Sequence, residues 1–295
     1  MNSHPVTADT VATTETKPAP DPAYADMLYR DRFWPGRRYE DGCDRIAIRA
    51  MLPRTGGRMI EIGAGFGRLA DEYEGYDSVV LLDLSGAQIR AARERLRDDP
   101  RYEVVEGDAF HLPFADASFD AVVCIRVIHH FEDPRPAIRE MARVLKPGGT
   151  LVLECGNKRN LKAIGLYWLR RRKTSPFKRG TERAPDIHLL PDAIRKRTAH
   201  QPAGPAPDKW EASTDFDHSP VDFRGWVREA GLRIEATRSI SNFRLPFVTR
   251  HVPLGILTWL ERRLQAPLAA VTIGPSVVVR AVRLSSPEPG RKPGK

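Results

Sequence analysis

The segment Glu61-Ile-Gly-Ala-Gly-Phe-Gly-Arg-Leu69 constrains the fold of this chain more than any other part of it. It follows the apolar approach of residues 58–60 and precedes a helix-like stretch over residues 68–73. This order predicts a strand, a glycine-rich turn and the start of a helix. Glycines without a Cβ atom let backbone N–H groups approach a nucleotide-like ligand closely. Three glycines occupy the turn: Gly63, Gly65 and Gly67.

The spacing of these glycines differs from the dinucleotide-binding fingerprint. That fingerprint, G-x-G-x-x-G, would place its third glycine at position 68, which is Arg68 in this chain. Glu61 stands two residues before the first glycine, where it would be a poor neighbour for phosphates but a good one for a cationic ligand. The spacing therefore disfavours a nicotinamide-dependent oxidoreductase, although the ribose of that cofactor could also use Asp83.

Strand-like and helix-like segments alternate after the glycine turn. Apolar or alternating runs predict four further strands, over residues 79–82, 102–106, 119–125 and 150–154. Helical patterns separate them over residues 68–73, 85–96 and 134–145. This alternation predicts an α/β fold, with a parallel sheet that is covered by helices on both faces. In such sheets ligands bind at the carboxyl ends of the strands.

Two aspartates stand at strand ends. Asp83 ends the second strand and is placed to accept hydrogen bonds from both hydroxyls of a ribose. Asp108 follows the third strand and could accept a hydrogen bond from an adenine amino group. The alternative is that each aspartate caps the helix that follows it, because aspartate is a favoured N-cap residue.

Five motifs in this order resemble the class I S-adenosylmethionine-dependent methyltransferases, and the similarity is greatest to the ubiquinone and menaquinone biosynthesis methyltransferase group. They are Glu-Ile-Gly-Ala-Gly-Phe-Gly, Leu-Leu-Asp-Leu-Ser, Glu-Gly-Asp-Ala, Phe-Asp-Ala-Val-Val-Cys and Leu-Lys-Pro-Gly-Gly, within residues 39–154. The resemblance implies a Rossmann-like, doubly wound sheet of seven strands, mostly parallel with the last strand antiparallel. It also implies S-adenosyl-L-methionine as the cofactor and methyl transfer to oxygen or carbon of a small-molecule or lipid-like acceptor.

The resemblance also implies roles for individual residues. The glycine turn would contact the methionine and ribose parts of the cofactor, Glu61 would face its amino group, and Asp83 would hold the ribose. Arg126 would lie near the sulfonium and carboxylate end, although it could instead form a salt bridge with a helix acid. The implied cofactor-binding residues are Glu61, Gly63, Ala64, Gly65, Gly67, Asp83, Leu84, Asp108, Ala109 and Arg126.

Three histidines are candidate general bases, because the usual pKa of histidine suits proton transfer near neutral pH. His129 and His130 follow the fourth strand, beside the expected methyl position, and His218 stands at the end of the insertion described next. The alternative for the first two is that they orient the loop or cap the next helix. The segment 124–131 lacks the Asn/Asp-Pro-Pro-aromatic sequence of enzymes that methylate amino groups of DNA bases, which makes that activity unlikely. With no acidic cluster evident, no metal is expected.

The second half departs from a minimal domain through an insertion after strand five, residues 156–219. An insertion at the ligand end of the sheet suggests a cover over the acceptor or a membrane-facing element. Beyond it the sequence predicts helices over residues 220–230 and 252–264 and strands over 232–241 and 276–282. Before strand one, Arg38 and Tyr39 are candidates for contact with the cofactor or acceptor.

The net charge of +9 is concentrated in the insertion. Residues 158–183 hold ten basic residues and one acid, Glu182. A nucleic-acid partner is therefore unlikely, because the excess charge is confined to one segment. Within residues 160–173 a helical face of apolar residues suggests contact with a membrane surface or a hydrophobic substrate, or else packing of that face on the core. The face consists of Leu161, Ile164, Trp168 and Leu169.

Composition bounds the remaining organisation. Residues 1–24 and 285–295 are rich in Pro and small or polar residues and are expected to be disordered tails, which leaves residues 25–284 as the methyltransferase domain. There is no signal-peptide pattern and no apolar run long enough to span a bilayer, so a cytoplasmic location is expected, with a peripheral membrane location as the alternative. A non-catalytic S-adenosylmethionine-binding regulatory protein is the alternative function.

Overall fold

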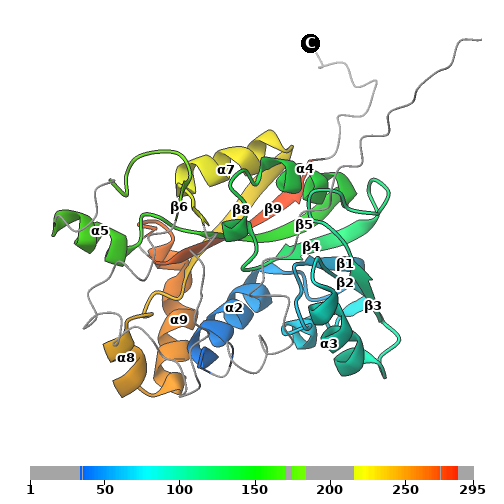
Figure 1. Cartoon of the computed structure of the whole chain (residues 1–295), viewed down its shortest axis with the longest axis horizontal. Helices are drawn as coiled ribbons and strands as arrows, with labels where there is room; N and C mark the ends of the chain where they lie inside the picture. The colour runs from blue at the N-terminus through cyan, green and yellow to red at the C-terminus, as the bar shows by residue number, and fades with distance from the viewer. Residues whose placement is uncertain (1–33, 35, 170–174, 184–215, 273, 285–295) are drawn as a thin grey trace, which may run out of the picture.

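The computed structural model describes residues 34, 36–169, 175–183, 216–272 and 274–284 (Figure 1). The two expected tails, residues 1–24 and 285–295, lie outside these described residues, as does the loop-like half of the insertion.

One sheet of seven strands forms the centre of the described chain, in the order β3-β2-β1-β4-β5-β9-β8. β9 pairs antiparallel with both of its neighbours, and the other strand pairs are parallel. This arrangement confirms the predicted mostly parallel sheet with an antiparallel last strand. The strands are β1 (Gly56–Ile62), β2 (Tyr76–Asp83), β3 (Tyr102–Glu106), β4 (Phe119–Cys124), β5 (Leu145–Gly156), β8 (Leu232–Ile240) and β9 (Ser276–Arg283).

Helices cover both faces of this sheet (Figure 1). On the upper face in Figure 1, α4 (Arg135–Val144) and α7 (Pro220–Glu229) pack against the sheet, and α2 (Arg38–Met51), α3 (Gly86–Leu96) and α9 (Leu254–Leu268) lie below it. The two hydrophobic clusters follow the alternation of the strands, because successive side chains point to opposite faces. Within β1, Ile60 belongs to the upper cluster and Met59 to the lower one.

The helix ends follow local chemistry. Ser85 is the N-cap of α3, and its side chain accepts a hydrogen bond from the Gln88 backbone N–H. α7 begins with Pro220 in its first turn and is followed by Gly231, whose φ of +80° suits the left-handed position after a helix. The predicted boundaries of these two helices are confirmed to within one residue.

The prediction of a helix over residues 68–73 is wrong. Only a short 3-10 turn, η2 (Ala70–Glu72), forms there. The glycine turn ends at Gly67 and β2 begins at Tyr76, so eight residues remain to return the chain to the other end of the sheet. That length leaves room for a tight turn but not for several turns of α-helix.

The direction of the strand order reverses at β1, which lies between β2 and β4. Parallel α/β sheets bind ligands in the crevice outside the carboxyl ends of the strands at such a switch point. The glycine turn follows β1, and η3 (Ile128–His130) follows β4. In the insertion, α5 (Leu161–Trp168) and a two-stranded sheet of β6 (Glu182–Arg183) and β7 (Phe216–Asp217) extend from the end of β5.

Candidate cofactor and acceptor site

The glycine turn lies across the end of β2. Gly63, Gly65 and Gly67 all have positive φ angles, of 71°, 55° and 74°. The Gly63 N–H donates to the Leu82 carbonyl at 2.8 Å. A Cβ atom at Gly63 would lie 2.1 Å from a methyl carbon of Val127, so only glycine fits between β1 and the segment after β4.

Asp83 fastens this turn to the start of α3. Its Oδ2 accepts from the Gly65 N–H at 2.8 Å, and its Oδ1 accepts from the Ser85 N–H at 2.9 Å. Burial raises the pKa of the Asp83 carboxyl, and these two N–H groups oppose the rise. Each carboxylate oxygen can accept a second hydrogen bond, so the side chain keeps capacity for two hydroxyl donors.

Asp108, Leu84 and Ala109 lie at the same edge of the sheet, because β2 and β3 are parallel neighbours. Asp108 Oδ1 accepts from the Phe110 N–H at 2.9 Å, which fixes a local turn. Neither aspartate is the N-cap of a helix: Ser85 caps α3, and in the described chain no helix starts between Asp108 and η3. The capping alternative is therefore wrong for both residues.

Glu61 is buried under the glycine turn, on the face of the sheet that α2 covers. It lies beside Tyr73 and Arg68. Burial raises the pKa of the Glu61 carboxyl to about 8, and the charge of Arg68 opposes that rise.

Arg126 forms a salt bridge with an acid of α2. Its Nε and Nη2 donate to the two oxygens of Asp44 at 2.8 and 2.9 Å, and Asp44 is fully buried. Arg68, from the glycine turn, donates to the same carboxylate at 2.9 Å. The Arg126 backbone, with a φ of +62°, donates its N–H to Glu154 at 2.9 Å. Asp44 thus joins α2 to the glycine turn and to the end of β4, and the salt-bridge alternative describes Arg126 in this structure.

His129 and His130 lie in η3, with their ring centroids 4.0 Å apart. Both side chains are partly buried. His130 is close enough to Asp83 to affect the pKa of that carboxyl. A Cβ atom at Gly156, the last residue of β5, would lie 3.7 Å from the Cβ of His129. The two histidines therefore lie between the glycine turn and the insertion.

His218 is buried, with both ring nitrogens within hydrogen-bond distance of a partner. Nε2 lies 3.3 Å from the Ile128 carbonyl, which can only accept, and Nδ1 lies 3.1 Å from the Thr181 hydroxyl. The ring therefore carries its proton on Nε2 and accepts from Thr181. Burial lowers the pKa of His218, and its ring meets Trp226 edge-on. This geometry makes His218 a connection between the insertion and η3.

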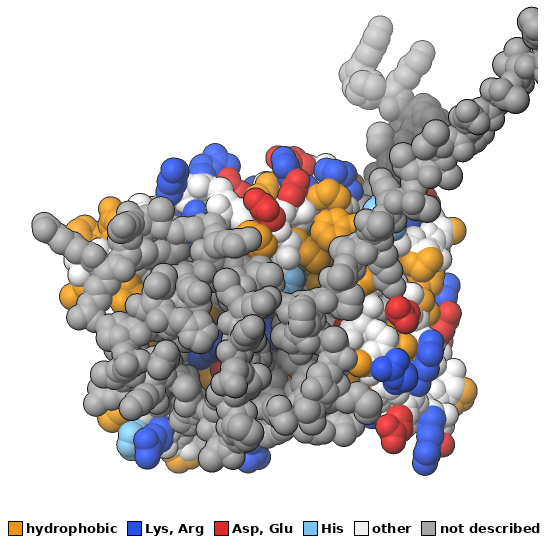
Figure 2. Space-filling view, viewed as in Figure 1, with side chains coloured by type: hydrophobic (Ala, Val, Ile, Leu, Met, Phe, Trp, Pro, Cys, Tyr) orange, Lys and Arg blue, Asp and Glu red, His pale blue; other side chains and the backbone are white. Residues whose placement is uncertain are grey.

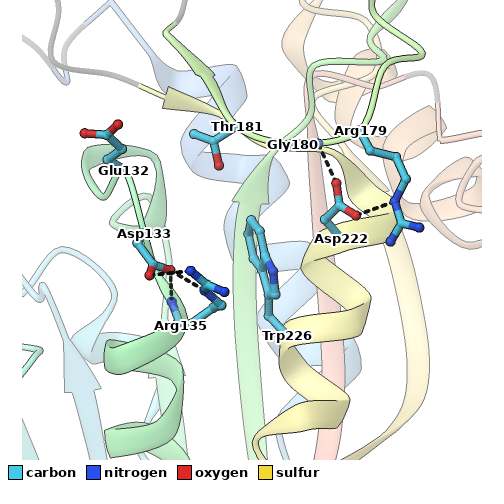
Figure 3. A pocket seen from close by; sticks show the side chains of 8 residues that line it. All are labelled: Glu132, Asp133, Arg135, Arg179, Gly180, Thr181, Asp222 and Trp226. Carbon is cyan, nitrogen blue, oxygen red and sulfur yellow. Dashed lines mark hydrogen bonds and ion pairs between the residues drawn. The ribbon is translucent and has the colours of Figure 1, made fainter.

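A cavity of about 490 Å³ lies beside this connection, between the loop after η3, the insertion and α7 (Figure 3). Asp222 accepts from Arg179 Nε and from the Gly180 N–H, both at 2.6 Å. Charged side chains of both signs surround this region in the space-filling view (Figure 2). No sequence motif indicated the cavity, because its walls come from three distant segments. It is lined by Glu132, Asp133, Arg135, Arg179, Gly180, Thr181, Asp222 and Trp226.

Tyr39 does not face the glycine turn. Its hydroxyl donates to the buried Glu261 of α9 and accepts from the Phe243 N–H. Tyr39 therefore connects α2 with α9, and Arg38 is exposed.

The apolar face of α5 is exposed. Leu161, Trp168 and Leu169 are 58%, 73% and 69% exposed, and Ala163 is the buried residue of this helix. The alternative that this face packs on the core does not describe these three side chains, whereas Ile164, the fourth residue of the face, is partly buried. In the part of the chain that the structure describes, no helix is both long and apolar enough to cross a bilayer. The described residues also contain no group of three or more His, Cys, Asp or Glu that could hold a metal ion.

Comparison with known proteins gives a match to the family described as "Methyltransferase domain" over residues 60–153. A ubiquinone/menaquinone biosynthesis C-methyltransferase from Pseudomonas fluorescens is 40% identical over 134 residues, which cover 42% of this chain and 51% of that protein. A 27-O-demethylrifamycin SV methyltransferase from Amycolatopsis mediterranei is 34% identical over 166 residues, which cover 47% and 59%. The chain thus spans about half the length of the curated relatives it matches.

Solved structures share the fold at low sequence identity. An S-adenosylmethionine-dependent methyltransferase from Thermotoga maritima, a possible histamine N-methyltransferase, aligns with a TM-score of 0.52 and 20% identity, covering 87% of this chain and 98% of that one. A geranyl diphosphate C-methyltransferase from Streptomyces coelicolor aligns with a TM-score of 0.52 and 14% identity, covering 82% and 77%. Motifs, domain match and fold agree: residues 60–153 belong to a methyltransferase domain, and the sheet around them has the fold of S-adenosylmethionine-dependent methyltransferases.

Proposed function

We propose that this protein transfers a methyl group from S-adenosyl-L-methionine to an oxygen or carbon atom of a small-molecule or lipid-like acceptor. The observation that carries the proposal is the Asp83 carboxylate, held by Gly65 and Ser85 at the switch point of the sheet. This carboxylate lies where the ribose of a nucleoside cofactor is bound in sheets of this type.

The cofactor would lie along the carboxyl ends of β1, β2 and β3. Asp83 would accept hydrogen bonds from the ribose hydroxyls, and Leu84, Asp108 and Ala109 would border the adenine. The turn residues Gly63, Ala64, Gly65 and Gly67 would contact the remainder. The carboxyl of Glu61, under the glycine turn, would attract the cationic amino group of the cofactor. Arg126, paired with Asp44, would lie at the methionine end of the cofactor.

The bound cofactor supplies an electrophilic methyl carbon, so the protein mainly needs to align an acceptor atom with it. The acceptor would lose a proton on transfer, and S-adenosylhomocysteine would be the second product. His129 or His130 would take that proton, because both lie between the glycine turn and the insertion. His218 would position η3 through its contact with the Ile128 carbonyl and would not act as the base, since both of its ring nitrogens already have hydrogen-bond partners.

The acceptor class is suggested by the relatives and by the insertion. The matched relatives are named for ubiquinone, menaquinone and rifamycin substrates, which supports an acceptor with a large apolar part. Within a methyltransferase domain of residues 25–284, the insertion 156–219 would cover the acceptor or face a membrane. Its basic segment, residues 158–183, would make a peripheral membrane contact in an otherwise cytoplasmic enzyme, and no nucleic-acid partner is proposed.

The first experiment is a calorimetric titration with S-adenosylmethionine and S-adenosylhomocysteine, followed by a labelled-methyl assay with quinol, phenol and polyketide acceptors. Micromolar binding with transfer of label supports the proposal. Binding without transfer to any acceptor or to any cell-extract fraction would favour the second candidate, a non-catalytic S-adenosylmethionine-binding regulatory protein. Absence of binding would contradict both.

A further inference from the structure

The connection between β8 and β9 exposes aromatic side chains that do not pack in the core. These strands are antiparallel neighbours, which a two-residue turn could join. Instead residues 241–275 leave the sheet and form α8 (Pro246–His251) and α9 before returning. α9 packs on α2 and β8, but the outer side of this excursion has no such partner among the described residues.

Opposite sides of α9 have opposite character. Leu257, Glu261 and Gln265 are buried and follow one another at intervals of four residues. Ile256 and Trp259, which are 51% and 57% exposed, lie on the other side of the helix at an interval of three. The buried side makes the contacts with α2, so the exposed side is free of any role in that packing.

α8 adds to the same outer surface. Phe247 is 74% exposed and Leu245 is 47% exposed. The ring of His251 lies 4.5 Å from the ring of Phe247. In the space-filling view, a histidine and Arg or Lys side chains lie beside hydrophobic ones at the lower left, over α8 (Figure 2). We define the outer aromatic surface as Leu245, Phe247, Ile256 and Trp259.

The charge around the outer aromatic surface is positive. Residues 241–272 contain four arginines and a single acid, Glu261, which is buried under the helix. The guanidinium of Arg263 lies 5.8 Å from the centre of the Trp259 ring. Arg244 pairs with Glu40 of α2 at 3.1 Å. The other exposed charges of this excursion are all basic: Arg250, Arg262 and Arg263.

α5 lies close to the start of this excursion. The charge of Arg244 acts on Lys162 of α5, 82 positions earlier in the sequence, and lowers the pKa of Lys162 together with burial, which is the larger cause.

We propose that the outer aromatic surface of α8 and α9 docks on an anionic lipid bilayer. Tryptophan and phenylalanine favour the interface between headgroups and acyl chains, and arginines beside them are attracted to anionic headgroups. This contact is separate from the one through residues 158–183 and does not depend on methyl transfer.

The test is flotation of the full chain with vesicles of phosphatidylcholine, with and without 30% phosphatidylglycerol. Phosphatidylglycerol supplies the anionic headgroups to which basic residues near a bilayer surface are attracted. We expect binding to the anionic vesicles only, and a loss of roughly tenfold or more in the double variant F247S/W259S. In R262E/R263E we expect a loss of similar size, because each basic residue near such a surface contributes about fivefold.

Trp168→Ser reports on the separate contact proposed through α5, because it removes the exposed tryptophan of that helix. If Trp168→Ser abolishes binding and F247S/W259S does not, α5 alone contacts the membrane and the proposal is wrong. Equal binding to neutral vesicles would also overturn it, as would a dimer in size-exclusion chromatography that F247S/W259S dissociates. Unchanged melting temperatures and unchanged S-adenosylmethionine affinity would show that the variants fold.

Discussion

The buried carboxylate of Asp44 holds the guanidinium of Arg126 through two hydrogen bonds, although 82 positions separate them. Arg68 donates to the same carboxylate. The helix before the sheet is therefore joined to the glycine turn and to the end of β4 by a carboxylate that water does not reach. Asp41 of the same helix adds a second, more exposed pair with Arg68.

Asp44→Asn should destabilise the protein strongly. The substitution leaves Arg126 buried without its counter-ion, and removing one partner of a buried pair typically costs about 3–5 kcal/mol. Urea denaturation measures the change in the free energy of unfolding. Asp41→Asn is the matched control, because Asp41 pairs with Arg45 and Arg68 but is 28% exposed, and its loss should cost much less. Equal losses in the two variants would contradict the role assigned to Asp44.

Asp83→Ala should weaken S-adenosylmethionine binding by at least about tenfold, because each charge-assisted hydrogen bond to the ribose contributes roughly 1.5–3 kcal/mol. Calorimetric titration of both proteins gives the ratio. Asp99→Ala removes an aspartate at the opposite end of the sheet, just before β3, and should leave the affinity unchanged. If Asp83→Ala binds as tightly as the original chain, the ribose lies elsewhere.

Glu61 should make the protein less stable as the pH rises. Burial raises the pKa of its carboxyl to about 8, whereas in the unfolded chain it titrates near 4.5. Between these values the folded state binds more protons than the unfolded state, so the free energy of unfolding falls with rising pH and levels off above about 8. Glu61→Gln should remove this pH dependence. At pH 9 the free energy of unfolding of the variant should exceed that of the original chain by about a few kcal/mol.

Denaturation of both proteins between pH 5 and pH 9 tests this expectation. The difference between the two free energies of unfolding should widen up to about pH 8 and then level off. A constant difference would mean that Glu61 is ionised throughout, in which case Arg68 compensates for its burial.

His218→Ala should lower stability without changing cofactor affinity. The ring bridges Thr181 and the Ile128 carbonyl, and the loss of a buried hydrogen-bonding group costs about 1–3 kcal/mol. Because the bridge lies on the side of the insertion, KM for the acceptor should rise more than kcat falls. A loss confined to kcat, with a changed pH profile, would instead make His218 the base.

His130→Gln and His129→Gln separate the two candidate bases. Removal of a general base lowers the rate about 10²–10⁴-fold, whereas loss of an orienting side chain costs less. Single-turnover rates with bound labelled cofactor measure the effect, and calorimetry shows whether cofactor binding is intact. If neither substitution slows transfer, the acceptor loses its proton without help from η3.

The sheet could be predicted because each strand carries its own signal. Val79 to Leu82 and Val277 to Val279 form continuous apolar runs, and both lie in buried strands of the observed sheet. Gly231 marked the end of α7 for a similarly local reason, since it occupies a left-handed position that other residues adopt at a cost.

The contacts across the site could not be predicted in this way. Nothing near Asp44 in the sequence indicates a partner at position 126, and nothing near His218 indicates Thr181. Such pairs depend on how the helices are placed over the sheet, which local propensity does not determine. The same limit applies to Trp259, because a helical pattern alone does not show which apolar face the core takes.

The pairing of β5 with β9 determines the order in which this sheet can assemble. Gly156 is opposite Ser276 and Thr150 is opposite Val282, so 120 to 132 positions separate the paired residues. β1 to β4, in contrast, complete their pairing within residues 56–124. Long-range pairing slows folding because a large loop must close first. The part of the sheet formed by β1 to β4 can therefore pair on the ribosome before β9, which completes the other edge of β5, has been synthesised.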